Sequence, residues 1–377
     1  MGKVLYLSLL DTNPNVLPYS GVMKKILLHI DAFRSYGHSV DYVETDEKNI
    51  FYVQDNKKTN IGNYCSSGYI YYNRIFSSAS KFIKKNKLKY DYIYVRHSAL
   101  SLFGYLNLAY LKQIANRIYF EIPTYSVPPK CIKNTIKFYF NKKIRKYVDR
   151  MVIDCNETEV YGIPTIRVIN GTDLSKITPR RPTPNPTQIN VMLVAYLQEY
   201  HGVDKIFKAI SEYYKSGGSR KVFIHVVGYG PKLDEYKKTV EEQNLSDYIK
   251  FYGKLSGQSL DDIFNKCEIG ISSLANKEIG VTYSSTLKSK EYLAKGLPII
   301  SDVMLDVFYE SPKYFFYQLE KDFNIPELVK FYDSVYQNHN KQDVINEIRS
   351  YANITCDMYK VLKAVDDDYL ISRKITL

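Results

Sequence analysis

Val222-Phe223-Ile224-His225-Val226-Val227-Gly228-Tyr229-Gly230-Pro231 joins an apolar, β-branched run to a turn that contains two glycines. The run predicts a buried strand over 222–227, and the residues that follow predict a helix over 231–244. A strand, a Gly-x-Gly turn and a helix in this order let a ligand approach the backbone, and N–H groups at the helix start can bind phosphate. Without a third glycine the motif is weak, so its meaning depends on the surrounding elements.

The same alternation of strand and helix extends to both sides of this turn. Further strands are predicted at 190–195, 249–252, 269–272 and 298–300, with helices at 202–214, 259–265 and 286–295. Upstream, strands are predicted at 4–9, 40–43, 92–95, 117–121, 151–153 and 166–169, with helices at 22–36, 100–115 and 134–147. The pattern predicts an α/β protein with two doubly wound parallel-sheet domains, whose ligands bind at the C-terminal ends of the strands.

A proline-rich segment separates the two halves of the chain. With 377 residues, the protein is longer than one ordinary hydrophobic core supports. Residues 178–188 contain four prolines, which neither a helix nor a central strand accommodates. We therefore expect a first domain at 1–177, a linker at 178–188 and a second domain at 189–354. The C-terminal segment 355–377 is expected to pack back on the first domain.

The positive charge of the chain lies in its first half. The formal net charge is +12, and residues 1–180 hold 27 Lys and Arg against 14 Asp and Glu. Residues 81–150 alone hold 16 positive and 3 negative side chains. Such a patch either binds an anionic partner, such as a membrane surface or a phosphorylated substrate, or is a solvated face.

The stretch 283–298 is more specific than the Gly-x-Gly turn. It places Ser284, Ser285 and Thr286 directly before a predicted helix, where hydroxyl side chains cap the first turn. Lys288 lies in that turn, where the helix dipole disfavours a cation unless an anion binds there. Glu291 follows one turn later, so its carboxylate can accept ribose hydroxyls while the helix N-terminus holds a diphosphate. An ordinary amphipathic helix with a surface glutamate is the alternative.

These motifs occur in the order found in one enzyme family. The chain resembles GT-B glycosyltransferases of the retaining family 4 (group 1) type in three motifs. They are the strand with Gly228-x-Gly230-Pro231, the segment 251–253 and Lys288-x-x-Glu291-Tyr292-Leu293-Ala294-x-Gly296-x-Pro298. Residues 20–21, 121–125, 170–173 and 201–204 match further family elements. The resemblance covers residues 1–305 and is closest to enzymes of capsular and O-antigen polysaccharide assembly. It implies two Rossmann-like domains that face each other across a cleft.

The resemblance also assigns donor-binding residues. It implies that Glu291 holds the ribose and that Lys288 contacts the diphosphate. Tyr283 stands where the family has a carboxylate that touches the donor sugar, and Tyr196 and His201 stand where an Arg and a Lys often bind the diphosphate. Lys288 is then expected to neutralise more of the negative charge of the diphosphate, together with a protonated His201. The implied donor-binding set is Gly21, His201, Gly228, Gly230, Tyr283, Ser285, Thr286, Leu287 and Glu291.

The reaction that the resemblance implies is sugar transfer with retention of configuration. The donor is a nucleotide-sugar, most readily a UDP-sugar, and the departing phosphate accepts the proton of the acceptor. Cations and helix N-terminal amides stabilise the charge on the leaving group. The implied catalytic residues are Lys288 in the second domain and Arg96, His97 and Glu121 near predicted strand ends in the first. No metal and no cofactor is expected, and 366–368, an Asp-Asp-Asp run, is interpreted as a solvated face.

The basic residues of the first domain suggest where the protein acts. An apolar stripe at Ile132, Ile136, Phe140 and Ile144 is accompanied by Lys133, Lys137, Lys142, Lys143, Arg145 and Lys146. Basic residues near an anionic bilayer each contribute about 1 kcal/mol. We expect a cytoplasmic protein, since its five cysteines form no pair motif. The basic residues further suggest that it is peripheral at the inner face of the membrane and that its saccharide acceptor is lipid-diphosphate-linked. The stripe itself is more simply explained by burial against the sheet.

Two other functions stay open at this level. Tyr196 and Tyr283 are compatible with a non-catalytic GT-B partner or chaperone of a glycosyltransferase. A basic, tyrosine-rich first domain is compatible with nucleic-acid binding, but no helix-turn-helix, RNA-binding aromatic motif or zinc spacing supports that function. No nucleic-acid partner is therefore expected.

Overall fold

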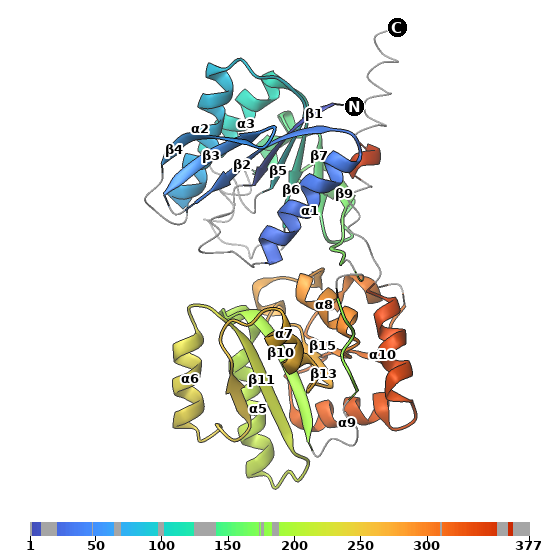
Figure 1. Ribbon diagram of the computed structural model, residues 1–377. Coiled ribbons are helices and arrows are strands. Elements are labelled where there is room, and N and C mark those ends of the chain that lie inside the picture. The colour runs from blue at the N-terminus through green and yellow to red at the C-terminus, as the bar shows by residue number, and fades with distance from the viewer. Residues whose placement is uncertain are drawn as a thin grey trace. The chain divides into compact units, whose positions relative to one another are not determined.

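The computed structural model describes residues 2–8, 21–46, 48–63, 69–96, 102–123, 141–172, 174, 177–182, 188–309, 311–352 and 361–364. The chain forms two compact units, residues 1–169 with 356–377 and residues 170–355 (Figure 1). Each unit contains a mainly parallel sheet with helices packed against it.

The first unit ends at residue 169, earlier than the proline content suggests. Residues 177–182, which include part of the segment expected to link the domains, belong to the second unit. Arg180 explains this placement, because it is buried and anchored by hydrogen bonds. Its Nε donates to the carbonyl oxygen of Gly296 (3.2 Å) and its Nη2 donates to Tyr336 Oη (2.8 Å). The prolines exclude regular structure here, but a buried guanidinium fixes the segment on the second unit.

The first unit is built around one sheet. Its strands are β1 (Lys3–Ser8), β2 (Ser39–Thr45), β3 (Asn49–Gln54), β4 (Lys57–Asn63), β5 (Tyr90–Arg96), β6 (Ala115–Glu121), β7 (Arg150–Ile153), β8 (Glu159–Val160) and β9 (Ile163–Arg167). Its helices are α1 (Gly21–Ser35), α2 (Tyr69–Lys85) and α3 (Leu102–Ile114), with a 3-10 helix at Ile144–Lys146. Among the described residues the strand order is β4-β3-β2-β1-β5-β6-β7-β9-β8. Neighbours are parallel except β2–β3, β3–β4 and β8–β9.

Helices cover both faces of this sheet, which explains why its central strands are apolar on both sides. In β1, Leu5 and Leu7 belong to the core that also contains residues of α2 and α3. Val4 and Tyr6 belong to the core on the other face, which contains residues of α1. Residues 361–362 of the C-terminal segment are buried in that second core.

The strand–helix alternation does not predict the hairpin of β3 and β4. Asp55 and Asn56 form its turn with φ of 48° and 62°, a conformation that these residue types tolerate in two-residue hairpin turns. β4 lies at the edge of the sheet and is mostly polar and exposed. An exposed edge strand therefore lacks the apolar run that identifies the central strands.

The second unit has a parallel sheet of its own. Its strands are β10 (Ile189–Tyr196), β11 (Val222–Tyr229), β12 (Ile249–Phe251), β13 (Ile269–Ile271), β15 (Ile299–Ser301) and β17 (Phe316–Gln318), in the order β12-β11-β10-β13-β15-β17. A small separate pair joins β14 (Tyr283–Ser284) to β16 (Met304–Leu305). The helices are α5 (Val203–Lys215), α6 (Leu233–Glu242), α7 (Gln258–Phe264), α8 (Leu287–Lys295), α9 (Ile325–Tyr336) and α10 (Lys341–Ser350), with 3-10 helices at Glu199–His201, Lys277–Ile279 and Asp306–Phe308.

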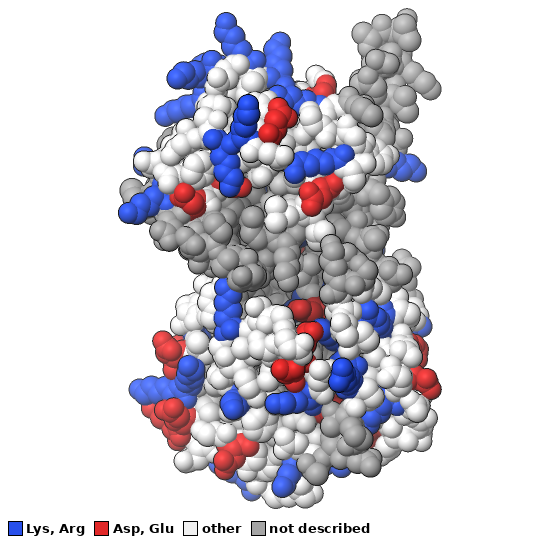
Figure 2. All heavy atoms as spheres, in the orientation of Figure 1, with Lys and Arg blue, Asp and Glu red and all other residues white. Residues whose placement is uncertain are grey.

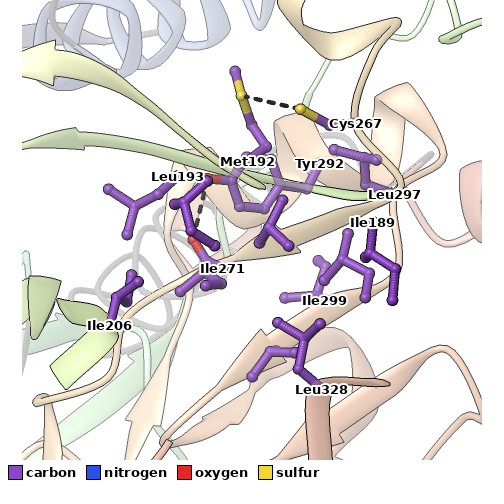
Figure 3. Packing of buried hydrophobic residues seen from close by; sticks show 14 of the residues in the cluster. Ile189, Met192, Leu193, Ile206, Cys267, Ile271, Tyr292, Leu297, Ile299 and Leu328 are labelled. Atoms are coloured by element: carbon purple, nitrogen blue, oxygen red, sulfur yellow. Dashed lines mark hydrogen bonds between the residues drawn. The ribbon is translucent and has the colours of Figure 1, made fainter. Parts of the chain in front are cut away.

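Tyr292 fixes helix α8 beneath the centre of this sheet. The backbone N–H of Val194 in β10 donates to Tyr292 Oη (2.8 Å), and that hydroxyl donates to the carbonyl oxygen of Ile271 in β13 (3.1 Å). Figure 3 shows the Tyr292 ring among the apolar side chains of the core, which include Leu193 and Leu297. One buried hydroxyl thus ties α8 to both central strands.

The prediction of an α/β protein with parallel sheets is confirmed, and the predicted elements of 190–300 are present within a few residues of their expected bounds. Helices α9 and α10 follow the last predicted strand. None of the helices that the structure describes is long and apolar enough to cross a membrane.

Candidate functional site

The order in which strands are added to the second sheet reverses at β10. The chain adds β11 and β12 on one side of this strand and β13, β15 and β17 on the other. In open parallel sheets, the crevice at such a switch point, outside the C-terminal ends of the strands, is where ligands bind. The segments that leave β10 and β13, residues 197–202 and 272–282, therefore delimit a candidate site.

These two segments are joined directly. The backbone N–H of Leu274 donates to the carbonyl oxygen of His201 (3.2 Å). Gly202 has φ of 65°, and a Cβ at this position would lie 2.8 Å from the Cβ of Leu274. Only glycine fits this close approach in a left-handed conformation. The His-Gly pair of the sequence is thus required by the contact between the two strand ends.

His201 is buried at this contact, and its side chain is neutral. Burial lowers the pKa of His201 to about 2, and the nearby charge of Lys288 lowers it further. The Nδ1 atom of the ring accepts a long hydrogen bond of 3.4 Å from the backbone N–H of Gln198. The ring is too poorly solvated to carry a charge near neutral pH, so the structure does not support the expectation that a protonated His201 helps to hold a diphosphate.

The Gly-x-Gly turn follows β11 and is shaped by contacts within the protein. Gly228 and Gly230 have φ of 140° and 152°, and a Cβ on Gly228 would overlap the carbonyl oxygen of Ala195. The backbone N–H of Leu197 donates to the carbonyl oxygen of Tyr229 (2.7 Å). The two glycines therefore let the ends of β10 and β11 approach each other, which is a sufficient reason for the motif in this chain.

Thr286 is the N-cap of α8, as the sequence predicts. Its φ and ψ of −85° and 148° are extended, and its side chain accepts a hydrogen bond from the backbone N–H of Ser289 (3.3 Å). Ser285 is buried just before it. The Ser285 Oγ donates to Asp306 Oδ2 (2.6 Å) and accepts from the backbone N–H of Asn170 (2.8 Å). The start of α8 is thus held by one cap and by a buried network behind it.

Lys288 lies in the first turn of α8 beside the switch point. Its Nζ donates to Ser273 Oγ (3.1 Å), directly after β13. Desolvation lowers the pKa of Lys288 to about 7, and the carboxylate of Asp302 partly opposes this shift. Within the described part of the chain Lys288 forms no ion pair. A partly desolvated lysine at a helix N-terminus, without a paired carboxylate, is a place where an anion is stabilised.

Asp302 completes this edge of the sheet, directly after β15. Its Oδ2 accepts from the backbone N–H of Lys277 (2.9 Å), and its Oδ1 is buried without a hydrogen-bond partner in the described structure. Desolvation raises the pKa of Asp302. The family resemblance seen in the sequence did not single out Asp302. Its position directly after an apolar strand was a signal that could have identified it.

Glu291 and Tyr283 occupy different surroundings. Glu291 is half-buried on α8, one turn after Lys288. Tyr283, in β14, is buried and packs edge-on against the ring of Tyr309, with 5.7 Å between ring centroids. Leu287 is the first residue of α8. The structure therefore brings Ser285, Thr286, Leu287, Lys288 and Glu291 together around one helix start, with His201 across the switch point.

The first unit has a second group of functional candidates at the C-terminal ends of β5 and β6. Arg96 and Glu121 are the last residues of these strands, and Arg96 Nε lies 3.1 Å from Glu121 Oε2. Lys25 Nζ lies 2.9 Å from Glu121 Oε1, and His29 Nδ1 lies 3.7 Å from Glu121 Oε2. Tyr94 Oη donates to Glu121 Oε2 (3.0 Å). We call these buried side chains the Glu121 cluster.

The charges of the Glu121 cluster follow from its geometry. Burial would raise the pKa of Glu121, but the charges of Arg96 and Lys25 outweigh it and hold that pKa well below its usual range. Burial lowers the pKa of His29 to about 3, so this ring is neutral at pH 7. Sequence reasoning missed Lys25 and His29. Their i, i+4 spacing on α1 was the available signal, since residues four apart share one face of a helix.

Some predicted residues lie outside the part of the chain that the structure describes. His97, Lys133, Lys137 and the acidic run 366–368 lie outside the described residues. Gly21 begins α1, directly after an undescribed segment. Of the apolar stripe expected to pack against the sheet, Ile144 is described, and it is buried in the first unit's core.

Basic side chains gather on the surface of the first unit. Lys142, Arg145 and Lys146 are exposed around the 3-10 helix that ends the predicted helix 134–147. Figure 2 shows Lys and Arg in excess on the visible face of the first unit, whereas both signs of charge are interspersed on that of the second. The charge asymmetry of the sequence is thus visible on this face of the two units.

One family model matches part of the chain. Residues 176–302 match the model of the family described as Glycosyl transferases group 1. No curated protein sequence matches the chain.

Solved structures match over nearly the whole chain. The sucrose-phosphate synthase of Thermosynechococcus elongatus is 12% identical, with a TM-score of 0.69, over 98% of this chain and 100% of its own. Anabaena HepE, in complex with UDP-glucose, is 11% identical, with a TM-score of 0.63, over 98% and 99%. The lipopolysaccharide outer core galactosyltransferase WaaB is 12% identical, with a TM-score of 0.56, over 98% and 99%. The chain therefore has the GT-B fold, with its residues 176–302 matching the group 1 glycosyltransferases.

Proposed function

We propose that this protein is a group 1 glycosyltransferase that moves a sugar from a nucleotide-sugar to a saccharide acceptor with retention of configuration. One observation carries the proposal. The start of α8 combines a capped N-terminus, an ammonium without a paired carboxylate at Lys288 and a carboxylate at Glu291, all at the switch point of the second sheet. These groups lie in the part of the chain that matches the family.

The groups at the start of α8 suit the parts of a nucleotide-sugar. The helix N-terminus and Lys288 bind the diphosphate, because both favour negative charge. Glu291 accepts hydrogen bonds from ribose hydroxyls, and Tyr283 contacts the donor sugar. Since His201 is neutral, the cation in this set that can stabilise the diphosphate is Lys288. A UDP-sugar is the proposed donor, which agrees with the UDP-glucose in the similar HepE structure.

The proposed reaction breaks the bond between the sugar's anomeric carbon and the diphosphate oxygen. The acceptor hydroxyl attacks the same face of the sugar, forms the new glycosidic bond and gives its proton to the departing phosphate. Lys288 and the α8 amides stabilise the charge that develops on the leaving group. Arg96, His97 and Glu121 are proposed to serve the reaction from the first unit. The scheme uses no metal and no cofactor.

The acceptor and the place of action are proposed from charge. The exposed basic residues around 142–146 suit an anionic membrane surface that carries a lipid-diphosphate-linked acceptor, as in surface polysaccharide assembly. Binding should weaken as salt rises, because exposed charges are screened within about 8 Å at physiological ionic strength. Sedimentation with anionic and with neutral vesicles tests this part. If the protein does not sediment with anionic vesicles at low salt, the membrane proposal is wrong.

A non-catalytic GT-B partner of a glycosyltransferase is the second candidate. The observation that favours it is the loss of charge at the site: His201 is neutral, and Tyr283 and Tyr196 provide no charge at two positions where the family has charged groups. Such a partner would bind another chain without turning over a nucleotide-sugar.

A thermal-shift screen with UDP-, GDP- and ADP-sugars separates the two candidates, because a ligand that binds only the folded protein raises its stability. The enzyme should be stabilised by one class and release free nucleotide diphosphate from it. Lys288→Gln should lose the stabilisation, whereas Lys330→Gln, on the exposed face of α9, should keep it. No stabilisation and no release by any of the three donors would favour the non-catalytic partner.

A further inference from the structure

The Glu121 cluster contains more positive than negative charge. Arg96 and Lys25 supply two cations, and Glu121 supplies one carboxylate. His29 adds no charge at neutral pH, because its pKa is about 3. All four side chains are more than nine-tenths buried. The described residues therefore enclose an excess of one positive charge, which is costly without a counter-charge.

Apart from Arg96 Nε, which lies 3.1 Å from Glu121 Oε2, two nitrogen atoms of the cluster lack hydrogen-bond partners in the described structure. Arg96 Nη1 and His29 Nε2 are fully enclosed, and neither has a partner in the part of the chain that the structure describes. The Glu121 carboxylate is already used, since its two oxygens face Lys25 on one side and Arg96, Tyr94 and His29 on the other. An enclosed donor with no acceptor costs about 1–3 kcal/mol, so proteins seldom leave one without a ligand or water.

The position of the cluster is that of a ligand site. β1 lies between β2 and β5, so the first sheet has its switch point between β1 and β5. Arg96 ends β5 opposite Ser8, the last residue of β1, which is also buried. Lys25 and His29 are on α1, the helix after β1. The excess charge therefore lies where open α/β sheets bind ligands.

We propose that Arg96 and Lys25 form a binding site for an oxyanion, a phosphate or carboxylate group, in the first unit. An oxyanion neutralises the excess charge and accepts the free N–H of Arg96, whose planar guanidinium matches phosphate and carboxylate geometry. Glu121 is then a positioning residue that holds both cations. That the oxyanion belongs to the sugar acceptor rests on the proposed transferase function, and it makes the acceptor an anionic molecule.

The alternative is a purely structural ion pair, and one isosteric variant separates the two. Glu121→Gln removes the negative charge and leaves two buried cations. An oxyanion site should then bind phosphate more tightly than the wild type does, by about threefold or more. A structural pair predicts loss of stability with no new response to phosphate.

The experiment is thermal unfolding of the full chain in inorganic phosphate, in acetate and in chloride at equal ionic strength. The wild type should be stabilised by phosphate or acetate beyond chloride. Arg96→Gln should weaken the apparent affinity for phosphate at least tenfold. Arg96→Lys keeps the charge but loses the paired N–H donors of the planar guanidinium, so it should weaken this affinity less. Lys3→Gln is the control, because Lys3 pairs with Asp41 at the N-terminal end of β1. Equal responses of wild type and Arg96→Gln, or none beyond chloride, would overturn the proposal.

Adding UDP separates this site from the donor site in the second unit. Phosphate should still stabilise the UDP-saturated wild type, and UDP should stabilise Arg96→Gln as well as the wild type. Stabilisation by UDP but not by phosphate or acetate rejects the oxyanion site and leaves the proposed function intact. An Arg96-dependent stabilisation by phosphate without any stabilisation by nucleotides supports the oxyanion site and rejects the proposed transferase function.

Discussion

The Lys290 ammonium lies 2.6 Å from Oδ2 of Asp306, and both side chains are fully buried. The same Oδ2 accepts the hydroxyl of Ser285, which accepts the backbone N–H of Asn170. This network connects the segment before α8 to the start of the second unit and to the 3-10 helix at 306–308. It holds the helix N-terminus on which the proposed function depends.

Removing the Asp306 carboxylate should destabilise the second unit strongly. Asp306→Ala removes the carboxylate that pairs with the buried Lys290 ammonium, and breaking a buried ion pair costs about 3–5 kcal/mol. Urea unfolding measures it, with Glu242→Gln as control, because the Lys238–Glu242 pair is exposed and such pairs contribute about 0–1 kcal/mol. Similar unfolding free energies for the two variants would show that the network does not hold the unit together.

The glycines of the Gly-x-Gly turn should be required for folding. Gly228→Ala places a Cβ against the Ala195 carbonyl oxygen in a strained backbone, and we expect a loss of about 3 kcal/mol or more. Gly217→Ala is the matched control, because Gly217 has φ of 84° but open space around it, so only strain of about 1 kcal/mol is expected. Thermal unfolding compares the two. An equal cost would mean that the strand ends do not meet as described.

The sequence predicts the central strands and α8 well, because their apolar runs and hydroxyl cap are local signals. It singles out Arg96 and Glu121 but does not reveal that Lys25 and His29 join them, since these residues are far apart in sequence and meet only when α1 packs on the sheet of β1, β5 and β6. The pairing of Lys290 with Asp306 is likewise tertiary. The charge state of His201 also depends on burial, which residue type does not report.

Buried neutral histidines should make the protein sensitive to mild acid. The pKa values of His29 and His201 are lowered in the folded protein, so the unfolded chain binds more protons below its ordinary histidine pKa of about 6.5. Stability is therefore full above that pH and falls as pH drops towards the folded values, by about 1.4 kcal/mol per pH unit for each histidine. His201→Asn should make this slope shallower in urea unfolding between pH 6.5 and 4. An unchanged slope would show that the pKa of His201 is not lowered by folding.

Nucleotide binding should depend on pH through Lys288. Its pKa is lowered to about 7, so the side chain is a cation below this pH and becomes neutral above it. The affinity for a nucleoside diphosphate should fall by up to about tenfold per pH unit above 7. Lys288→Arg should remove this dependence, because arginine stays charged. Calorimetry from pH 6 to 8.5 measures it, and a flat profile for the wild type would exclude Lys288 as the phosphate ligand.

Tyr283 should affect the sugar more than the nucleotide. Its ring packs on Tyr309, and under the proposed function it contacts the donor sugar. Tyr283→Ala should therefore lower the transfer rate while the affinity for free nucleotide stays nearly unchanged. Tyr309→Ala, which removes the packing partner, is the matched control. Equal losses of transfer and of nucleotide binding in Tyr283→Ala would mean that Tyr283 only packs the segment before α8.

Donor kinetics of Glu291→Ala test the central claim, that the start of α8 binds a nucleotide-sugar, most directly. Loss of charged hydrogen bonds to the ribose costs about 1.5–3 kcal/mol, so kcat/KM for the donor should fall by about tenfold or more, mainly through a higher KM. Glu242→Gln, on exposed α6, should leave these constants unchanged. Wild-type donor kinetics in Glu291→Ala would contradict the claim.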